Sequence, residues 1–178
     1  AIALLVDAVG NDTRLQDSEL RKLQLYADSS QKPLSAEVVA ALVTANTQNS
    51  FKLAEAIREG DTGRALGLVE DLIARNEPPL VIAATIIGRF RTWLWVKLMT
   101  SEGIRDEMAI AKAAEVPNPK RVYILLKEVQ SIGLPQLQKT LPILLDLEVS
   151  LKQGSDAKTT LIAKVIELCQ ILRTVRRP

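Results

Sequence analysis

The stretch from residue 50 to residue 99 constrains the fold most, because its apolar residues recur with the spacing of helices and not of strands. Gly60 and Asp61 punctuate it in the way that a helix end and a following cap or turn do. Pro78 and Pro79 suit the start of the next helix, where a missing N–H costs nothing. The pattern predicts a helical hairpin followed by a third, longer helix, with no cluster of catalytic side chains.

The rest of the chain carries similar signals. Ser35, Asp106 and Asp156 precede apolar runs and suit helix N-caps, while Gly103 and Gly154 suit helix ends. No segment alternates apolar and polar residues with period 2, so we predict an all-α fold. The expected helices cover about 13–26, 36–43, 51–59, 64–75, 79–101, 107–114, 119–131, 135–153 and 157–174.

Some residues conflict with regular helices. The run TANTQN at 44–49 is polar and poor in helix formers, and we place a domain boundary there. Pro142 lies inside an expected helix, where proline costs about 3 kcal/mol, so we expect a kink or a break near Thr140. Gly67 and Gly88 also lie inside expected helices, at a cost of about 1 kcal/mol each relative to alanine. Either a closely approaching neighbouring helix or simple tolerance explains these two glycines.

Composition narrows the chemistry. The chain of 178 residues has no histidine, which removes the commonest general base and metal ligand. Its one cysteine, Cys169, excludes an internal disulfide and a cysteine-based zinc site, and its apolar surroundings predict a buried side chain. A net charge of +2 is too small to imply nucleic-acid binding by itself. We therefore expect no catalytic residues, no metal and no cofactor in this chain.

The start of the chain and its longest apolar run bear on where in the cell the protein is found. The run at 79–88 is ended by Arg89 and Arg91 and falls short of the roughly 20 residues of a membrane span, so we expect no membrane association. No secretory signal is evident, and together with the single thiol this predicts a cytoplasmic protein. The chain starts without methionine inside the apolar run AIALLVDAV, which suggests a fragment of a longer protein.

Both tryptophans of the chain lie among basic residues of one expected helix. We take Arg89, Arg91, Trp93 and Trp95 as candidate subunit-interface residues. Core packing with arginines that reach solvent, a protein interface and binding of single-stranded nucleic acid all fit this pattern. Because Trp93 and Trp95 are two positions apart, they cannot share a helix face, and at least one should meet a second surface.

Residues 107–129 have the layout of a helix-turn-helix. A short helix precedes a turn with Pro117 and Pro119, and the second helix opens with Lys120 and Arg121, which would face a major groove in a DNA reader. The second helix soon becomes apolar, which favours ordinary helix packing. A helix-turn-helix DNA-binding regulator is the alternative function.

Several ordered segments resemble a known family. VGNDTRLQDSELRKLQLYA, at 9–27, is similar to the pattern "vGnDlr.l.nEleKLalya" of the delta subunit of the bacterial DNA polymerase III clamp loader. The segments IAKAAEVPNPKRVYIL and DLEVSLKQGS also fit it. The positions that match are Asp12, Leu15, Glu19, Lys22, Leu23, Phe51, Gly60, Asp61, Ala65, Leu66, Pro79, Leu80, Arg89 and Lys97.

This resemblance implies a domain organisation. Residues 1–48 would form part of a small helical AAA+ lid domain, and residues 49–178 a helical collar domain. The N-terminal domain that binds the sliding clamp would be absent. The delta subunit of this family does not bind ATP, which agrees with the lack of a GxxxxGK[ST] phosphate loop in this sequence.

The resemblance also implies partners and a role. The collar would assemble with the clamp-loader ATPase subunits and the delta-prime subunit, so that full-length delta can open and load the clamp during DNA replication. The fragment would be non-catalytic inside a DNA polymerase holoenzyme and would reach the clamp only through the missing domain. An indirect contact with primer-template DNA stays open.

Overall fold

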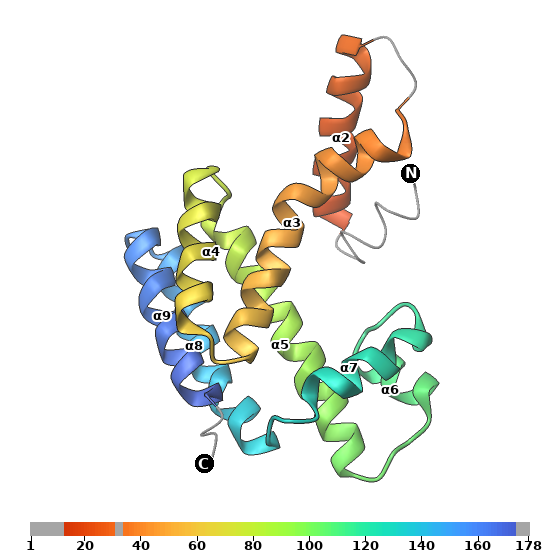
Figure 1. Ribbon diagram of the computed structural model, residues 1–178, viewed down its shortest axis with the longest axis vertical. Helices are drawn as coiled ribbons and strands as arrows, with labels where there is room; N and C mark the ends of the chain where they lie inside the picture. The colour runs from red at the N-terminus through yellow and green to blue at the C-terminus, as the bar shows by residue number, and fades with distance from the viewer. Residues whose placement is uncertain (1–12, 31–33, 174–178) are drawn as a thin grey trace. The chain divides into compact units, whose positions relative to one another are not determined.

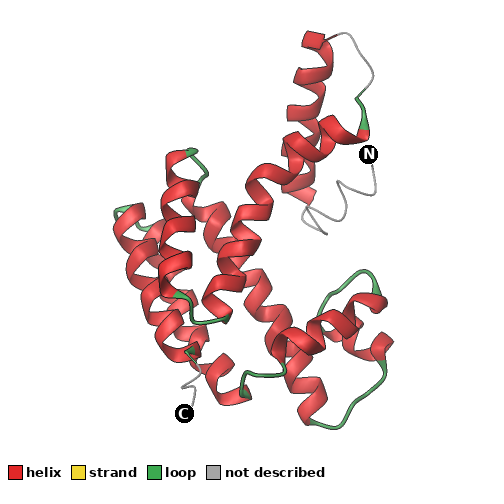
Figure 2. Ribbon diagram, viewed as in Figure 1, coloured by secondary structure: helices red, strands yellow, loops and turns green. Residues whose placement is uncertain are grey.

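The computed structural model describes residues 13–30 and 34–173, and these residues form α-helices and one 3-10 helix, with no strand among them. The predicted all-α fold is confirmed (Figure 2). The elements are α2 (Thr13–Ser30), α3 (Ala36–Arg58), α4 (Thr62–Ala74), α5 (Pro79–Ser101), α6 (Glu107–Ala113), η1 (Pro119–Arg121), α7 (Val122–Val129), α8 (Leu134–Lys152) and α9 (Ala157–Leu172), as labelled in Figure 1.

The chain divides into two compact units, Ala1–Asn49 and Ser50–Pro178, which are called unit 1 and unit 2 below. In the described part of unit 1, Leu23 of α2 and Val39 of α3 are buried. Ser35 caps α3 as predicted, because its Oγ accepts the N–H of Val38 at 3.2 Å. Asp12, one of the residues that carry the family resemblance, lies outside the described residues.

The polar run at 44–49 does not interrupt the helix. α3 is continuous from Ala36 to Arg58, so the expected end of a helix at residue 43 is wrong. Threonine and asparagine lower helix stability only by fractions of a kcal/mol each, and the run contains neither glycine nor proline. The division between the two units therefore falls within a helix.

Unit 2 is built around α5. This helix contacts α6 and α7 towards one side, and α8 and α9 towards the other, while α4 contacts α9 (Figure 1). The core is mostly aliphatic, as the low aromatic content predicts. Phe90 and Trp93 of α5 add one aromatic pair, with ring centroids 5.1 Å apart in an edge-to-face arrangement.

Most helix boundaries follow the sequence signals. Asp61 and Asp156 each accept the backbone N–H three residues further on, at 3.0 and 2.9 Å. Asp106 accepts the N–H two residues further on at 3.0 Å. α5 begins at Pro79 as predicted and is followed by Gly103, whose φ is +80°.

Gly60 has two reasons to be glycine. Its φ of +68° is a left-handed conformation that favours glycine. A Cβ at this position would also lie 2.8 Å from the Cα of Arg173, at the end of α9. The turn before α4 therefore lies directly against the backbone of the last described residue.

α8 tolerates its internal proline. The helix is continuous through Pro142, so the expected break near Thr140 is wrong. Leu137, Leu144 and Leu147 bury one side of α8 in the core. We attribute the continuity to this burial, since one buried leucine contributes about 2 to 3 kcal/mol, comparable to the cost of the proline.

The two glycines inside helices, Gly67 and Gly88, have open surroundings. A Cβ at Gly67 or at Gly88 would meet no atom within 4 Å outside its own helix turn. The explanation by close approach of a neighbouring helix is wrong for both positions. Simple tolerance of glycine on an exposed helix surface accounts for them.

Among the described helices, α5 alone is long and apolar enough to cross a membrane by length and composition. The sequence-based estimate counted only its first ten residues, because two arginines follow them. In the structure the apolar side chains of Ile82, Ile86 and Val96 are buried in the core of unit 2. Packing inside the protein therefore accounts for these apolar residues of α5.

Candidate subunit interface

The four candidate interface residues lie on different sides of α5. Trp93 is fully buried, and Arg89 is largely buried beside it. Trp95 is 41% exposed, and Arg91 is also exposed. The structure therefore brings Arg89 and Trp93 together in the interior and leaves Arg91 and Trp95 on the surface.

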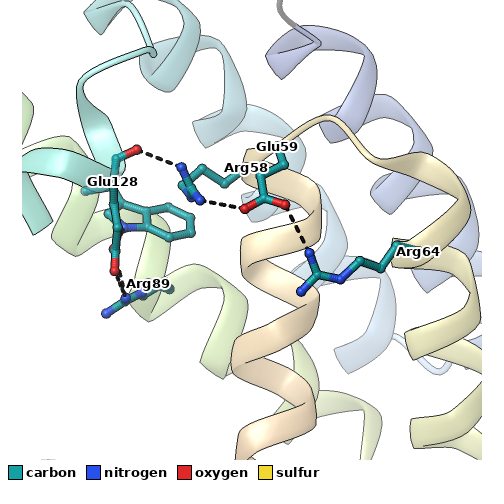
Figure 3. A network of polar contacts seen from close by, with 6 residues as sticks. Arg58, Glu59, Arg64, Arg89 and Glu128 are labelled. Atoms are coloured by element: carbon teal, nitrogen blue, oxygen red, sulfur yellow. Dashed lines mark hydrogen bonds and ion pairs between the residues drawn. The ribbon is translucent and has the colours of Figure 1, made fainter. Parts of the chain in front are cut away.

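A carboxylate from α7 organises the interior pair. Oε2 of Glu128 accepts the indole N–H of Trp93 at 2.6 Å. The same oxygen accepts a guanidinium N–H of Arg89 at 2.8 Å (Figure 3). The other carboxylate oxygen of Glu128 accepts from the same Arg89 nitrogen at 2.9 Å. The carbon of the Arg89 guanidinium lies 5.2 Å from the centroid of the Trp93 ring, within the range of a cation–π contact.

Arg58, near the end of α3, extends this arrangement into a chain of polar contacts (Figure 3). One terminal nitrogen donates to the backbone carbonyl of Glu128 at 2.9 Å, and the other donates to Glu59 at 2.8 Å. Glu59 in turn accepts from Arg64 of α4 at 3.0 Å. The polar network, defined as Arg58, Arg89, Trp93 and Glu128, thus joins α3, α5 and α7.

Burial makes this network energetically important. The side chains of Arg89 and Glu128 are only 15% and 16% exposed. Burial lowers the pKa of Arg89, and the neighbouring carboxylate of Glu128 opposes that effect. Arginine nevertheless keeps its proton near neutral pH, so the pair is ionic. Removing either partner would leave the other charge buried without its counter-ion.

A second basic side chain fixes the end of α7. Nζ of Lys97 donates to the carbonyl of Val129 at 3.0 Å and lies 3.5 Å from the carbonyl of Gln130. Carbonyls at a helix C-terminus lack partners within the helix and favour a cation. The basic residues of α5 that suggested nucleic-acid contact in the sequence therefore include two, Arg89 and Lys97, that hold α7.

Sequence reasoning missed Arg58 and Glu128. A signal for Glu128 was present, because it lies three residues after Leu125, on the apolar side of a mainly apolar helix. Its partners could not be read from the sequence, since Trp93 is 35 residues away and Arg58 is 70 residues away.

The exposed side of α5 has fewer polar contacts than its buried side. Arg91 forms an ion pair with Glu115, and both side chains are exposed. Trp95 lies four residues further along the same helix, so the two side chains project from neighbouring positions on one face. Gly88, also exposed, precedes Arg91 on that face.

The segment with the helix-turn-helix layout folds as α6, η1 and α7. Lys120 and Arg121 are exposed, and they lie in the 3-10 turn before α7. Val122 and Leu125 are buried, which agrees with the expected apolar packing of this helix. Ordinary packing on α5 therefore explains most of α7.

No grouping of side chains for metal chemistry is found within residues 13–30 and 34–173. Cys169 is buried, as predicted, and burial raises the pKa of its thiol. The described residues define an all-α protein whose interior polar groups hold helices together.

Comparison with known proteins identifies the family. A family model described as "DNA polymerase III delta subunit, C-terminal domain" matches residues 47–167, which is more than half of the chain. The chain belongs to this family, and the resemblance found in the sequence is confirmed. The matched region begins near the division between units 1 and 2.

A solved structure supports the fold. The Bacillus subtilis DNA clamp loader delta protein matches with a TM-score of 0.62 and 24% sequence identity. The match covers 93% of this chain and 49% of that protein, so the chain spans about half its length. A comparison with curated protein sequences gives no match.

Proposed function

We propose that this chain is a non-catalytic part of a clamp-loader delta subunit in the cytoplasm, acting in DNA replication. Residues 1–48 act as part of a lid domain, and residues 49–178 act as a collar. The family match over residues 47–167 carries this proposal. It also favours the clamp loader over a helix-turn-helix regulator.

The collar joins the clamp-loader ATPase subunits and the delta-prime subunit and sets the place of delta among them. The sliding clamp is bound by a part of the delta subunit that this chain does not include. This division of roles agrees with the size of the match, which covers about half of the Bacillus protein. The helical fold of unit 2, whose interior polar network joins α5 to α7, agrees with a role in holding subunits together.

The outer face of α5 is one proposed contact with a neighbouring subunit. Trp95 is large, rigid and exposed, and tryptophan is enriched among the residues that dominate binding energies. The network around Trp93 supports this face from inside, because it fixes α5 against α7. Arg91 and Glu115 would form its charged rim.

Reconstitution tests this function. The chain is mixed with purified ATPase subunits and delta-prime subunit and is analysed by size-exclusion chromatography with light scattering. Co-elution is expected, together with no binding to the sliding clamp and no ATPase activity from the chain alone. Failure to co-elute would refute the proposal.

Trp95→Ala tests the contact on α5. We expect at least a tenfold loss of affinity for the assembly, as for a central interface residue. Tyr123→Ala is the matched control, since Tyr123 is an exposed aromatic residue on α7. Equal affinity of the wild-type chain and Trp95→Ala would argue against this face.

A further inference from the structure

The side of α7 that points away from the core combines basic and apolar side chains. The inner side of this helix is marked by three buried residues, Val122, Leu125 and Val129. η1 leads directly into α7, so helical spacing across both elements places a second set of residues opposite these three. The members of this set are all exposed and define the outer face of α7, which consists of Lys120, Tyr123, Ile124 and Lys127.

The centre of the outer face is apolar. Tyr123 is 57% exposed and Ile124 is 54% exposed, although large apolar side chains usually lie inside a protein. Nζ of Lys127 lies 4.2 Å from the centroid of the Tyr123 ring, which is a cation–π contact. This contact restrains the ammonium group, so Lys127 loses less side-chain freedom when it binds an anion.

The two lysines of the outer face have no carboxylate of their own. Elsewhere in the chain, lysines pair with glutamates three or four residues away in the same helix, as in Lys22 with Glu19, Lys152 with Glu148 and Lys164 with Glu167. Within residues 13–30 and 34–173, neither Lys120 nor Lys127 forms an ion pair. Their charges are therefore available to a partner.

The surrounding charged groups leave the outer face positive. The carboxylates on the neighbouring elements and turns are Glu55, Glu59, Asp106, Glu107, Glu115 and Glu128. Glu128 belongs to the interior network, and Glu55 and Glu59 lie on the side of that network. Glu115 pairs with Arg91, and the two remaining carboxylates are at the start of α6, the end that does not lead into η1. Lys112 and Arg121 are also exposed and add positive charge on α6 and η1.

This combination selects one kind of ligand. A wholly apolar partner would remove water from two ammonium groups without supplying a counter-ion. Single-stranded nucleic acid would supply phosphates, but its bases stack on open aromatic faces, and Lys127 already covers one face of Tyr123. Ile124 would also gain nothing from phosphates. A peptide segment that carries both carboxylates and apolar side chains uses all four residues of the outer face.

We propose that the outer face of α7 binds an acidic segment of a partner protein. Lys120 and Lys127 are seven residues apart, which is about 10 Å along a helix. An extended peptide spans that distance in three residues of about 3.3 Å each. Two carboxylates three positions apart therefore pair with the two lysines, and an apolar residue between them packs on Tyr123 and Ile124. This inference does not rest on the proposed function, and the outer face lies on a different helix from Trp95.

The peptide Gly-Ser-Asp-Leu-Phe-Asp-Gly-Ser, with a fluorescent label, is the probe for this site. Fluorescence anisotropy with the full chain measures its affinity. We expect Lys120→Ala combined with Lys127→Ala to weaken binding about tenfold, and Ile124→Ser about fivefold. The matched control is Lys52→Ala combined with Lys139→Ala, which removes the same charge from exposed positions on α3 and α8 and should bind within about twofold of the wild-type chain. Circular dichroism and the melting temperature establish that each variant folds.

Changes in the probe complete the test. Replacing both aspartates by asparagine, or leucine and phenylalanine by serine, should each weaken binding about tenfold, because the site uses both kinds of contact. Equal losses in the two double-lysine variants would show attraction by net charge only and would refute the site. No binding up to about 1 mM probe would also refute it. If a short oligothymidylate binds more tightly than the peptide and loses affinity in the Lys120 and Lys127 variant, nucleic acid occupies the face and the proposal is overturned.

Discussion

The interior around Trp93 and the outer face of α7 place their charged groups in different surroundings. Around Trp93, an arginine, a carboxylate and an indole N–H are buried and bonded to one another. On the outer face, two lysines without an ion pair among the described residues flank the exposed Tyr123 and Ile124. The first region has its partners within the chain, while the second is the kind of surface that another molecule covers. The buried polar residues thus indicate contacts within the chain, whereas the outer face indicates a contact with another molecule.

The contrast between enclosed and exposed positions should affect stability most on the two sides of α8. Leu137→Ala should lower the free energy of unfolding by about 2.7 to 5 kcal/mol, because Leu137 is fully enclosed and its removal leaves a cavity. Leu145→Ala should change it by less than about 0.5 kcal/mol in the isolated chain, because Leu145 is 62% exposed. Urea denaturation of both variants measures the difference. Similar losses would mean that Leu145 is already packed within the chain.

The polar network should be sensitive to loss of one member. Glu128→Ala should destabilise the chain by about 3 kcal/mol, since it leaves Arg89 and the indole N–H of Trp93 without their acceptor. Glu115→Ala, which breaks the exposed pair with Arg91, should cost at most about 1 kcal/mol. The comparison uses the same denaturation assay. If the two glutamates proved equivalent, the interior network would not have the role assigned to it.

Two glycines repeat the contrast between enclosed and open positions. Gly60→Ala should destabilise by about 2 kcal/mol, because alanine resists a left-handed conformation and its Cβ would collide with the backbone of Arg173. Gly67→Ala should instead stabilise by up to about 1 kcal/mol, since the position is open and helical. Melting temperatures should therefore move in opposite directions. A stabilising Gly60→Ala would contradict the close approach of the two backbones.

The cap of α9 should give the smallest effect, and one that depends on pH. The hydroxyl and the backbone N–H of Thr159 hold the pKa of Asp156 below the ordinary value of 3.8. A lowered folded-state pKa means that the carboxylate stabilises the fold fully above about pH 3.8 and loses that effect as the pH falls through the folded pKa. The difference in melting temperature between the wild-type chain and Asp156→Ala should therefore be larger at pH 7 than at pH 2. A difference that does not depend on pH would show that the charge of the cap is unimportant.

The features of the fold that were predictable depend on contacts between residues close together in the sequence. Asp61, Asp106 and Asp156 cap helices, and Pro79 starts one, through contacts within a few residues. The same local rules failed where packing overrode them. α8 continues through Pro142 because its buried side holds it in the core.

The candidate site was predictable only in part. The spacing of Trp93 and Trp95 predicted that they face different ways, and the structure agrees. The sequence also carried a signal for which tryptophan lies inside that the prediction did not use, because Trp93 continues the apolar stripe of Ile86 and Phe90 at helical spacing. What it could not give is the acceptor of the indole N–H, since Glu128 lies 35 residues beyond Trp93.

By itself, the sequence determined the helical class, most helix ends and the family, because these depend on neighbouring residues or on an ordered series of residue types. Only the tertiary structure decided which faces of α5 and α8 are enclosed and which are free. That decision arises from contacts between segments far apart in the chain, such as Arg58 and Glu128, which no local pattern specifies.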